Sequence, residues 1–342
     1  MHPLTRRGFL AAATGAALAG TASRAPAFAA SPTAYLGISN NGTEPYDELE
    51  GAIGRHFAGQ RKNRGFREQA PTADELSLYG ERGYHAVFHN IPSTLGPDPT
   101  TGGKIIVPWR EVGAGSQDAY FDRLAEAARA TGYWSPRRPL IVCFHHEQSV
   151  DTAGQPGYPS CGSYADYRKA FARMHARFHR KTALVGQGGP IAVAFAGLWS
   201  QFTAARSDPA RIGHFEPPAY DYLGVDDYNR VGRSGALKQG SNAAPVLDAF
   251  RSFALGRPKR TGKAVPWLII PECGCEHATG EAAWWNSLFQ TVKGWGGKRR
   301  AGACRGIWLT HEPQNGPWDL LDGVAAPVIG EWGAKAFYRR TA

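Results

Sequence analysis

The segment that decides the fold reads Leu140-Ile141-Val142-Cys143-Phe144-His145-His146-Glu147-Gln148. Its first half is a short apolar run, which is typical of a strand buried on both faces. Polar residues follow at once, and in barrels of parallel strands the residues at the carboxyl ends of the strands carry the chemistry. We therefore predict a buried strand that delivers Glu147 to a functional edge of a parallel sheet.

Similar apolar runs recur along the chain and alternate with amphipathic segments, a pattern that predicts a parallel sheet with helical crossovers. The expected strands are Tyr35–Ile38, Arg55–Ala58, Ala86–Asn90, Leu140–Phe144, Ile191–Phe195, Tyr222–Val225, Trp267–Ile270 and Gly306–Leu309. The expected helices are Asp118–Ala130, Tyr164–His179, Glu281–Val292 and Gly333–Arg339. Since no linker or shorter repeat divides the chain, we predict an α/β fold with a single (β/α)8 TIM barrel over residues 31–342.

The first 30 residues have the features of an export signal. A paired arginine at Arg6-Arg7 precedes a mild apolar stretch to about Gly20, and small residues lead to Ala29. The apolar stretch is shorter than the roughly 20 residues that a membrane span needs. We therefore predict a twin-arginine-type signal peptide at residues 1–30, cleaved near Ala29, and a secreted, extracellular protein with no membrane attachment after cleavage.

The composition is that of a globular protein, with 42% hydrophobic and 20% charged residues, which excludes a disordered chain. The formal net charge is +10, of which Arg6, Arg7 and Arg24 belong to the signal. The remaining excess is scattered in short basic clusters between expected elements, as in solvated loops. We therefore expect no nucleic-acid partner.

The cysteines number five, at Cys143, Cys161, Cys273, Cys275 and Cys304. Because the number is odd, at least one is free or paired between chains in an oxidising compartment. The Cys273-Gly274-Cys275 spacing is too tight for a usual zinc knuckle, and no second close pair completes one. We therefore expect no metal and no other cofactor.

A second carboxylate follows another apolar run, where Trp267–Ile270 leads into Pro271-Glu272-Cys273-Gly274. As the fourth and seventh strands of a barrel, these two runs place Glu147 and Glu272 at the same mouth with space between them. Glycoside hydrolysis requires two carboxyl groups that face one bond. The pair therefore predicts a glycosidase.

From about the third strand to the eighth, the chain resembles glycoside hydrolase family 26, the clan-A β-mannanase-like barrels. His146-Glu147 matches the His-Glu pair that bears the acid/base, and Glu272-Cys273-Gly274 matches the Glu-x-Gly turn that bears the nucleophile. Asp226-Asp227-Tyr228 is similar to the Asp-x-Tyr segment. The resemblance implies that Glu147 is the acid/base, that Glu272 is the nucleophile and that the Tyr228 hydroxyl holds Glu272. It also implies that His146, Asp226 and Tyr228 line the site and contact the sugar.

The resemblance also implies residues that contact sugar. His89 and Trp109 look like family positions at the subsite beside the cleaved bond. We expect Trp308 on the eighth strand to form an aromatic platform under the sugar, since the apolar face of a pyranose packs on indole, and Trp199 at the end of the fifth strand to have the same relation to the mouth. At Gln148 mannanases often have methionine. This difference bears on the leaving-group subsites and therefore on the identity of the substrate.

These features predict a secreted, retaining endo-β-glycoside hydrolase that acts as a monomer by double displacement, with its two carboxyl groups about 5 to 5.5 Å apart. The substrate is a plant-type β-1,4-linked polysaccharide or oligosaccharide, β-mannan first, with xylan or β-glucan as alternatives. A metal-dependent hydrolase is a second class, with His145, His146 and Glu147 as candidate ligands near His89. His145 and Glu147 could share a metal, but His146 could not join them without a kink, because neighbours on a strand face opposite ways. A non-catalytic glycan-binding barrel is the third.

Overall fold

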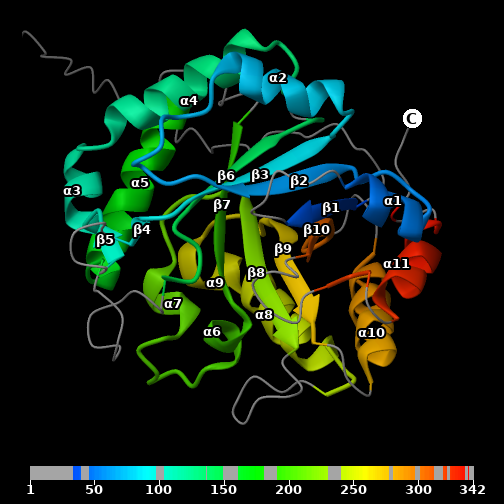
Figure 1. Cartoon of the computed structure of the whole chain (residues 1–342). Helices are drawn as coiled ribbons and strands as arrows, with labels where there is room; N and C mark the ends of the chain where they lie inside the picture. Colours follow the sequence, from blue (N-terminus) through cyan, green and yellow to red (C-terminus); the bar gives the residue numbers. More distant parts are fainter. Residues whose placement is uncertain are drawn as a thin grey trace, which may run out of the picture.

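The computed structural model describes residues 34–39, 46–97, 104–135, 137–148, 161–180, 191–229, 240–276, 280–296, 301–311, 319–321, 324–335 and 338. Within them, eight parallel strands close into a barrel (Figure 1). In barrel order they are β1 (Tyr35–Ser39), β2 (Gly59–Asn63), β3 (Ala86–Ile91), β6 (Leu140–Phe144), β7 (Ile191–Leu198), β8 (Tyr222–Asn229), β9 (Trp267–Cys275) and β10 (Cys304–Thr310). The last strand pairs with the first, so the predicted (β/α)8 TIM barrel is confirmed.

Helices surround the barrel (Figure 1). They are α1 (Asp47–Ile53), α2 (Ala73–Glu81), α3 (Trp109–Ala114), α4 (Asp118–Ala130), α5 (Tyr164–Arg180), α6 (Trp199–Thr203), α7 (Ile212–Phe215), α8 (Ala244–Leu255), α9 (Arg257–Thr261), α10 (Glu281–Gly294) and α11 (Ala325–Gly333). An antiparallel pair, β4 (Thr94–Pro97) and β5 (Lys104–Ile106), is inserted after β3. None of the helices in the described ranges is long and apolar enough to cross a membrane. The proposed signal, residues 1–30, lies outside the described residues and stays a prediction.

Two apolar layers hold the barrel together. Outward-facing strand residues pack on the apolar stripes of the helices, such as Tyr167, Phe171, Met174 and Phe178 of α5. Inward-facing residues fill the lumen, namely Tyr35, Ala58, Ala86, Phe88, Ile141, Cys143, Ala192, Ala194, Ala196, Tyr222, Ile269 and Trp308. The lumen is therefore a packed core that supports the mouth above it.

Two predicted elements are wrong in position. The second strand is Gly59–Asn63 rather than Arg55–Ala58, because its residues Gln60, Arg61 and Lys62 are polar and give no apolar run. The last helix among the described residues is Ala325–Gly333, whose spacing of Ala325, Ile329 and Trp332 provides the buried face, whereas the helix predicted over Gly333–Arg339 is not continued at 334 and 335 and includes residues 336, 337 and 339, which lie outside the described residues. The other predicted strands and helices are present, with β7, β8 and β9 longer than predicted at their carboxyl ends.

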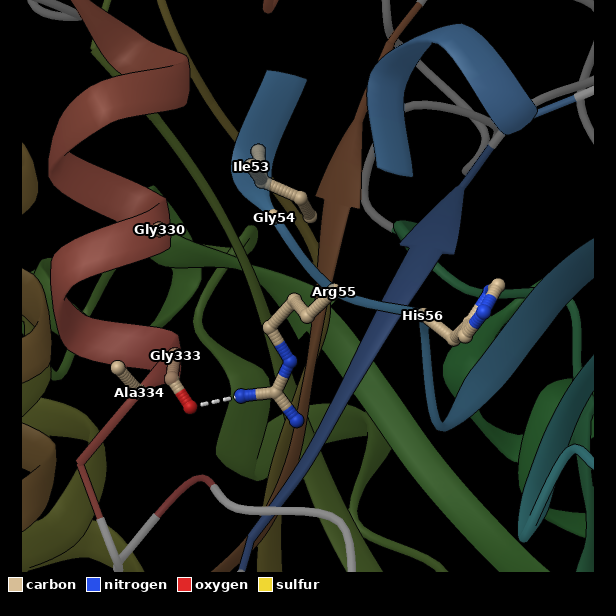
Figure 2. A pocket seen from close by; sticks show the side chains of 7 residues that line it. All are labelled: Ile53, Gly54, Arg55, His56, Gly330, Gly333 and Ala334. Atoms are coloured by element: carbon tan, nitrogen blue, oxygen red, sulfur yellow. Dashed lines mark hydrogen bonds between the residues drawn. The ribbon is translucent and has the colours of Figure 1, made fainter. Parts of the chain in front are cut away.

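A pocket of about 380 Å³ lies between α11 and the segment that joins α1 to β2 (Figure 2). It is lined by Ile53, Gly54, Arg55, His56, Gly330, Gly333 and Ala334. The Arg55 guanidinium points across it and donates a hydrogen bond to the Gly333 carbonyl. Because residues 54–56 precede β2, this pocket is at the amino-terminal end of the barrel, opposite the end where the predicted carboxylates lie.

Candidate active site

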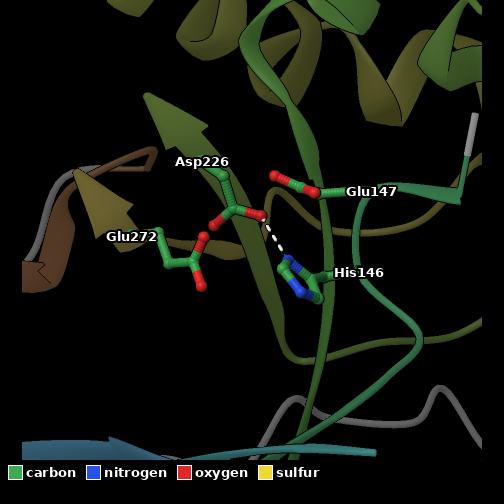
Figure 3. A group of neighbouring side chains, drawn as sticks. All are labelled: His146, Glu147, Asp226 and Glu272. Carbon is green, nitrogen blue, oxygen red and sulfur yellow. Dashed lines mark hydrogen bonds and ion pairs between the residues drawn. The ribbon is translucent and has the colours of Figure 1, made fainter. Parts of the chain in front are cut away.

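Four side chains converge at the carboxyl ends of three barrel strands (Figure 3). His146 and Glu147 directly follow β6, Asp226 belongs to β8, and Glu272 belongs to β9. One nitrogen or oxygen of each lies within 4.8 Å of the others. The two carboxylates predicted from the fourth and seventh strands therefore meet, and Asp226 and His146 lie between them.

An arginine that was not among the predicted site residues neutralises this cluster. Arg61 projects from β2, is 1% exposed, and forms an ion pair through Nη1 with Glu272 Oε1. The same nitrogen donates a hydrogen bond to Ser39 Oγ (3.1 Å), and the guanidinium lies over the Phe88 ring at 5.9 Å. A buried carboxylate is stable only with a partner of opposite charge or strong hydrogen bonds. Arg61 supplies that charge to Glu272.

The carboxylate of Glu272 is held on both oxygens. Its Oε2 accepts a hydrogen bond from the Tyr228 hydroxyl at 2.6 Å, and that hydroxyl is also 3.2 Å from Thr310 Oγ1. Burial would raise the pKa of Glu272, but the Arg61 guanidinium and the Tyr228 hydrogen bond outweigh it and hold the pKa below its usual value. Glu272 is thus ionised and oriented.

Glu147 has the opposite electrostatics. Burial, with the nearby Asp226 and Glu272 carboxylates, raises the pKa of Glu147 to about 7, although the Arg61 guanidinium opposes the shift. One carboxyl group of the pair therefore holds a proton near neutral pH while the other does not. A pair of carboxyl groups with separated pKa values is the arrangement that acid/base and nucleophilic roles require.

His146 links the remaining groups. Its Nδ1 is 2.7 Å from Asp226 Oδ2, and its Nε2 is 3.2 Å from Nη2 of Arg61. Burial and the neighbouring Glu272 raise the pKa of Asp226 well above its usual value. His146, predicted as a sugar contact, is therefore engaged on both ring nitrogens by protein groups.

Comparison with solved structures finds this architecture in glycoside hydrolases. The chain is similar to the catalytic domain of a family 26 endo-β-1,4-mannanase from a Bacillus species (TM-score 0.57, 13% identity, 89% of this chain and 86% of that one). It is also similar to a family 26 β-mannanase from Bacteroides ovatus (TM-score 0.55, 13% identity, 89% of both chains). A family 26 protein from a Muricauda species gives a TM-score of 0.55 at 11% identity over 90% of this chain and 86% of that one.

The fold is that of glycoside hydrolase family 26. No family model matches the sequence, and no curated protein is similar to it in sequence. At 11–13% identity in these structures the likeness concerns the barrel. In the barrel of this chain β6 and β9 are the fourth and seventh strands, and Glu147 and Glu272 lie at their carboxyl ends.

The segment that carries Glu147 in this family 26 fold has a strained backbone. His145 and Glu147 have φ values of 45° and 59°, in the left-handed region that residues other than glycine rarely adopt. Hydrogen bonds hold the segment: the His145 amide donates to Ile91 O (3.0 Å), the Ser93 amide donates to His145 Nδ1 (2.9 Å), and the His146 amide donates to Asn90 Oδ1 (3.3 Å). The strain turns His146 and Glu147 toward the mouth together.

This geometry corrects the pairing expected for a metal site. On a regular strand His145 and Glu147 would share a face, but the left-handed residues break the alternation. His145 instead packs edge-on against Trp109, with ring centroids 5.2 Å apart. The proposed sharing of a metal by His145 and Glu147 is therefore wrong.

Gln148 departs from the family pattern, and its side chain points into the protein. It is fully buried, and its amide nitrogen donates to Ala196 O at 2.5 Å and to the Tyr167 hydroxyl at 2.9 Å. These bonds tie the end of the Glu147 segment to β7 and α5. Gln148 therefore anchors the segment rather than facing a leaving group.

The structure does not place Trp308 under a sugar. Trp308 is 0% exposed in the lumen, 5.9 Å from the Phe88 ring, and a side chain at Gly37 or Gly306 would overlap its indole. Glycines on neighbouring strand positions therefore make room for the ring inside the barrel. The expectation of an aromatic platform at Trp308 is wrong for this conformation, because stacking needs an exposed face.

The other three predicted sugar contacts are also enclosed. Trp109 begins α3 and is fully buried, and His89 is 2% exposed, with its pKa lowered by burial to about 3. His89 Nε2 lies 3.4 Å from the Tyr120 hydroxyl. Trp199 begins α6 directly after β7 and keeps 8% of its surface exposed. A direct sugar contact is therefore not available to Trp109 or His89, whereas Trp199 remains a candidate.

All five cysteines are buried, and they form no disulfide with one another. Burial raises the pKa of Cys275 to about 12, so its thiol stays protonated. Cys273, next to Glu272, is fully buried on the opposite side of β9, where its thiol donates to Trp308 O at 3.4 Å. The unusual cysteine pair therefore packs in the barrel wall.

Proposed function

We propose that this protein is a retaining β-glycoside hydrolase with Glu147 as acid/base and Glu272 as nucleophile. One observation carries the proposal: an oxygen of each carboxyl group lies within 4.8 Å of the other, and their pKa values are shifted in opposite directions. Retaining enzymes have carboxyl groups about 5 to 5.5 Å apart, whereas inverting enzymes need about 6.5 to 9.5 Å for a water molecule. Oxygens within 4.8 Å of each other place the two carboxyl groups nearer to the retaining arrangement than to the inverting one, which supports double displacement.

In the first step, Glu272 Oε attacks the anomeric carbon while the bond from that carbon to the leaving oxygen breaks, and Glu147 gives its proton to that oxygen. In the second step, a water molecule attacks the anomeric carbon, its proton passes to Glu147, and the bond to Glu272 breaks. Two inversions at the anomeric carbon leave its configuration unchanged. The ion pair with Arg61 keeps Glu272 ionised for attack. The same guanidinium stabilises the Glu272 carboxylate when it leaves in the second step.

For the substrate we propose a β-1,4-linked polysaccharide or oligosaccharide, with β-mannan first, acted on outside the cell by a monomer. The support is that the similar solved structures include endo-β-1,4-mannanases and β-mannanases. Xylan and β-glucan differ from mannan by the orientation or presence of single groups on the ring. They remain the alternatives within the same chemistry.

The proposal predicts that the purified protein releases reducing sugar from one member of a panel of mannan, galactomannan, xylan and mixed-linked β-glucan. Proton NMR of the first product formed should show the β anomer before mutarotation, because double displacement retains configuration. An initial α anomer contradicts the mechanism. If no member of the panel is cleaved, the enzyme proposal falls, and glycan binding without turnover would then favour a binding barrel.

We also predict a bell-shaped dependence of kcat/KM on pH. Attack needs Glu272 ionised and Glu147 protonated. The acidic limb should lie below the usual pKa of a glutamate because the Glu272 pKa is lowered, and the alkaline limb should lie near pH 7 because the Glu147 pKa is about 7. In Glu147→Gln, assayed on an aryl glycoside whose leaving group needs no protonation, the alkaline limb should disappear. An unchanged limb in that variant would assign it to another group.

A further inference from the structure

His146 lies between a group that can only donate hydrogen bonds and a carboxylate. Its Nε2 is 3.2 Å from Nη2 of Arg61, and its Nδ1 is 2.7 Å from Asp226 Oδ2. A guanidinium has no acceptor, so Nε2 must accept, and the ring proton must be on Nδ1, where it is donated to Asp226. An imidazolium would point two N–H groups at each other across the contact with Arg61.

We propose that His146 is a positioning residue: as a neutral imidazole with its proton on Nδ1, it holds the Arg61 guanidinium against Glu272. The catalytic importance of this role rests on the proposed function, in which Glu272, the partner of Arg61, is the nucleophile. The order of donation is Arg61 to His146 and His146 to Asp226. His146 thus acts through Arg61, without touching the reacting atoms.

The need for such a residue follows from the surroundings of Arg61. Its guanidinium is buried near two carboxylates, Glu272 on β9 and Asp226 on β8, which compete for it. The His146 imidazole lies between Arg61 and Asp226 and accepts a hydrogen bond from Nη2 of Arg61. Nη1 of Arg61 contacts Glu272 and Ser39. His146 therefore donates its own N–H to Asp226, so that the Arg61 guanidinium stays paired with Glu272.

Within the described residues, the groups that face His146 come from several elements. Arg61 is on β2, Asp226 on β8 and Glu272 on β9, while Glu147 is its neighbour on the strained segment. Its backbone amide is fixed on β3 by Asn90 Oδ1, at 3.3 Å. The ring is 15% exposed, so few rotations are open to it. Position and proton placement are thus both set by protein groups.

The first experiment reads the proton directly. In protein labelled with ¹⁵N-histidine at pH 7, the His146 signals, assigned by their absence in His146→Gln, should show a protonated Nδ1 and an unprotonated Nε2. A proton on Nε2, or on both nitrogens, overturns the inference. This readout needs no substrate, so it decides the placement of the proton even if no glycan is cleaved.

The second experiment measures the effect on Glu272. In protein labelled with ¹³C at glutamate carboxyl carbons, with the Glu272 signal assigned by its absence in Glu272→Gln, His146→Leu should raise the Glu272 pKa by about one unit, since a displaced opposite charge is worth 1 to 3 units. His146→Gln should restore the value close to that of the unmutated protein, because an amide oxygen accepts from Arg61 and an amide N–H donates to Asp226.

His146→Gln also separates the inference from a purely electrostatic role. If His146 acted as a cation, the neutral glutamine would raise the Glu272 pKa as much as leucine does, and that result overturns the inference. His311→Leu is the matched control, because His311 follows β10 and its Nδ1 lies 3.6 Å from Asp319 Oδ1. It should leave the Glu272 pKa unchanged. If circular dichroism shows that His146→Leu does not fold, the Glu272 pKa in His146→Gln and the ¹⁵N signals of His146 still test the inference.

Discussion

Replacing Glu272 by glutamine is expected to lower kcat for β-glycan hydrolysis by about 10⁴-fold or more, the scale seen when a nucleophile that acts with its partners as a unit is removed. The physical reason is that an amide cannot form the glycosyl-enzyme bond. Glutamine has nearly the same size as glutamate, so the packing around Arg61 and Tyr228 should change little. Rates from single-turnover assays on the glycan that the unmutated protein cleaves would measure the loss. KM should change much less than kcat.

Glu276→Gln is the matched control for this change. Glu276 follows β9 four positions after Glu272 and is 6% exposed, so the same substitution alters a buried carboxylate of the same segment. Its rate should stay within about tenfold of the unmutated protein, as expected for a group that is not in the reaction. Equal losses in both variants would show that the segment, and not the Glu272 carboxylate, is what the reaction requires.

The sequence predicts the two carboxylates because each follows an apolar run that has to be a buried strand. For β6 and β9 the signal is local: the strand residues are apolar and the polar residue that comes next must lie at the sheet edge. Arg61 escapes the same reasoning, since β2 reads Gly-Gln-Arg-Lys-Asn and its buried arginine is compensated by Glu272, more than 200 residues further on. A strand made acceptable by a distant ion pair has no apolar pattern to detect.

Two other differences have equally specific causes. The alternation expected at His145-His146-Glu147 fails because two residues adopt left-handed backbone, which depends on anchors such as Asn90 in β3 and Ser93 just after it. The position of Trp308 inside the lumen depends on the absence of side chains at Gly37 and Gly306 on adjacent strand positions. Both are tertiary facts, so the presence of a tryptophan near a strand end could not decide between core and mouth.

Arg61→Met is expected to lower the free energy of unfolding by about 3 to 5 kcal/mol at pH 7, the usual cost of removing one partner of a buried ion pair. Methionine fills much of the space above Phe88 but leaves Glu272 and Asp226 buried without a counter-charge. Urea denaturation at pH 7 would measure the loss. The acidic limb of the kcat/KM profile should also move to higher pH, because the Glu272 pKa is no longer lowered.

The pH dependence of that loss tests its cause. In the unmutated protein the Glu272 pKa is lowered by folding, so the ionised carboxylate stabilises the fold above the usual glutamate pKa, and this contribution is lost as the pH falls through the folded pKa. The difference between Arg61→Met and the unmutated protein should therefore shrink as the pH falls from 7 toward 4, because the buried carboxyl groups of the variant, which have no counter-charge, take up protons above the usual carboxyl pKa. Arg257→Met is the control, because Arg257 is similarly buried but pairs with Glu216 away from the mouth. Arg257→Met should destabilise the fold without moving the acidic limb of the kcat/KM profile. If Arg61→Met loses the same free energy of unfolding at pH 7 and at pH 4, then Arg61 contributes packing and not charge.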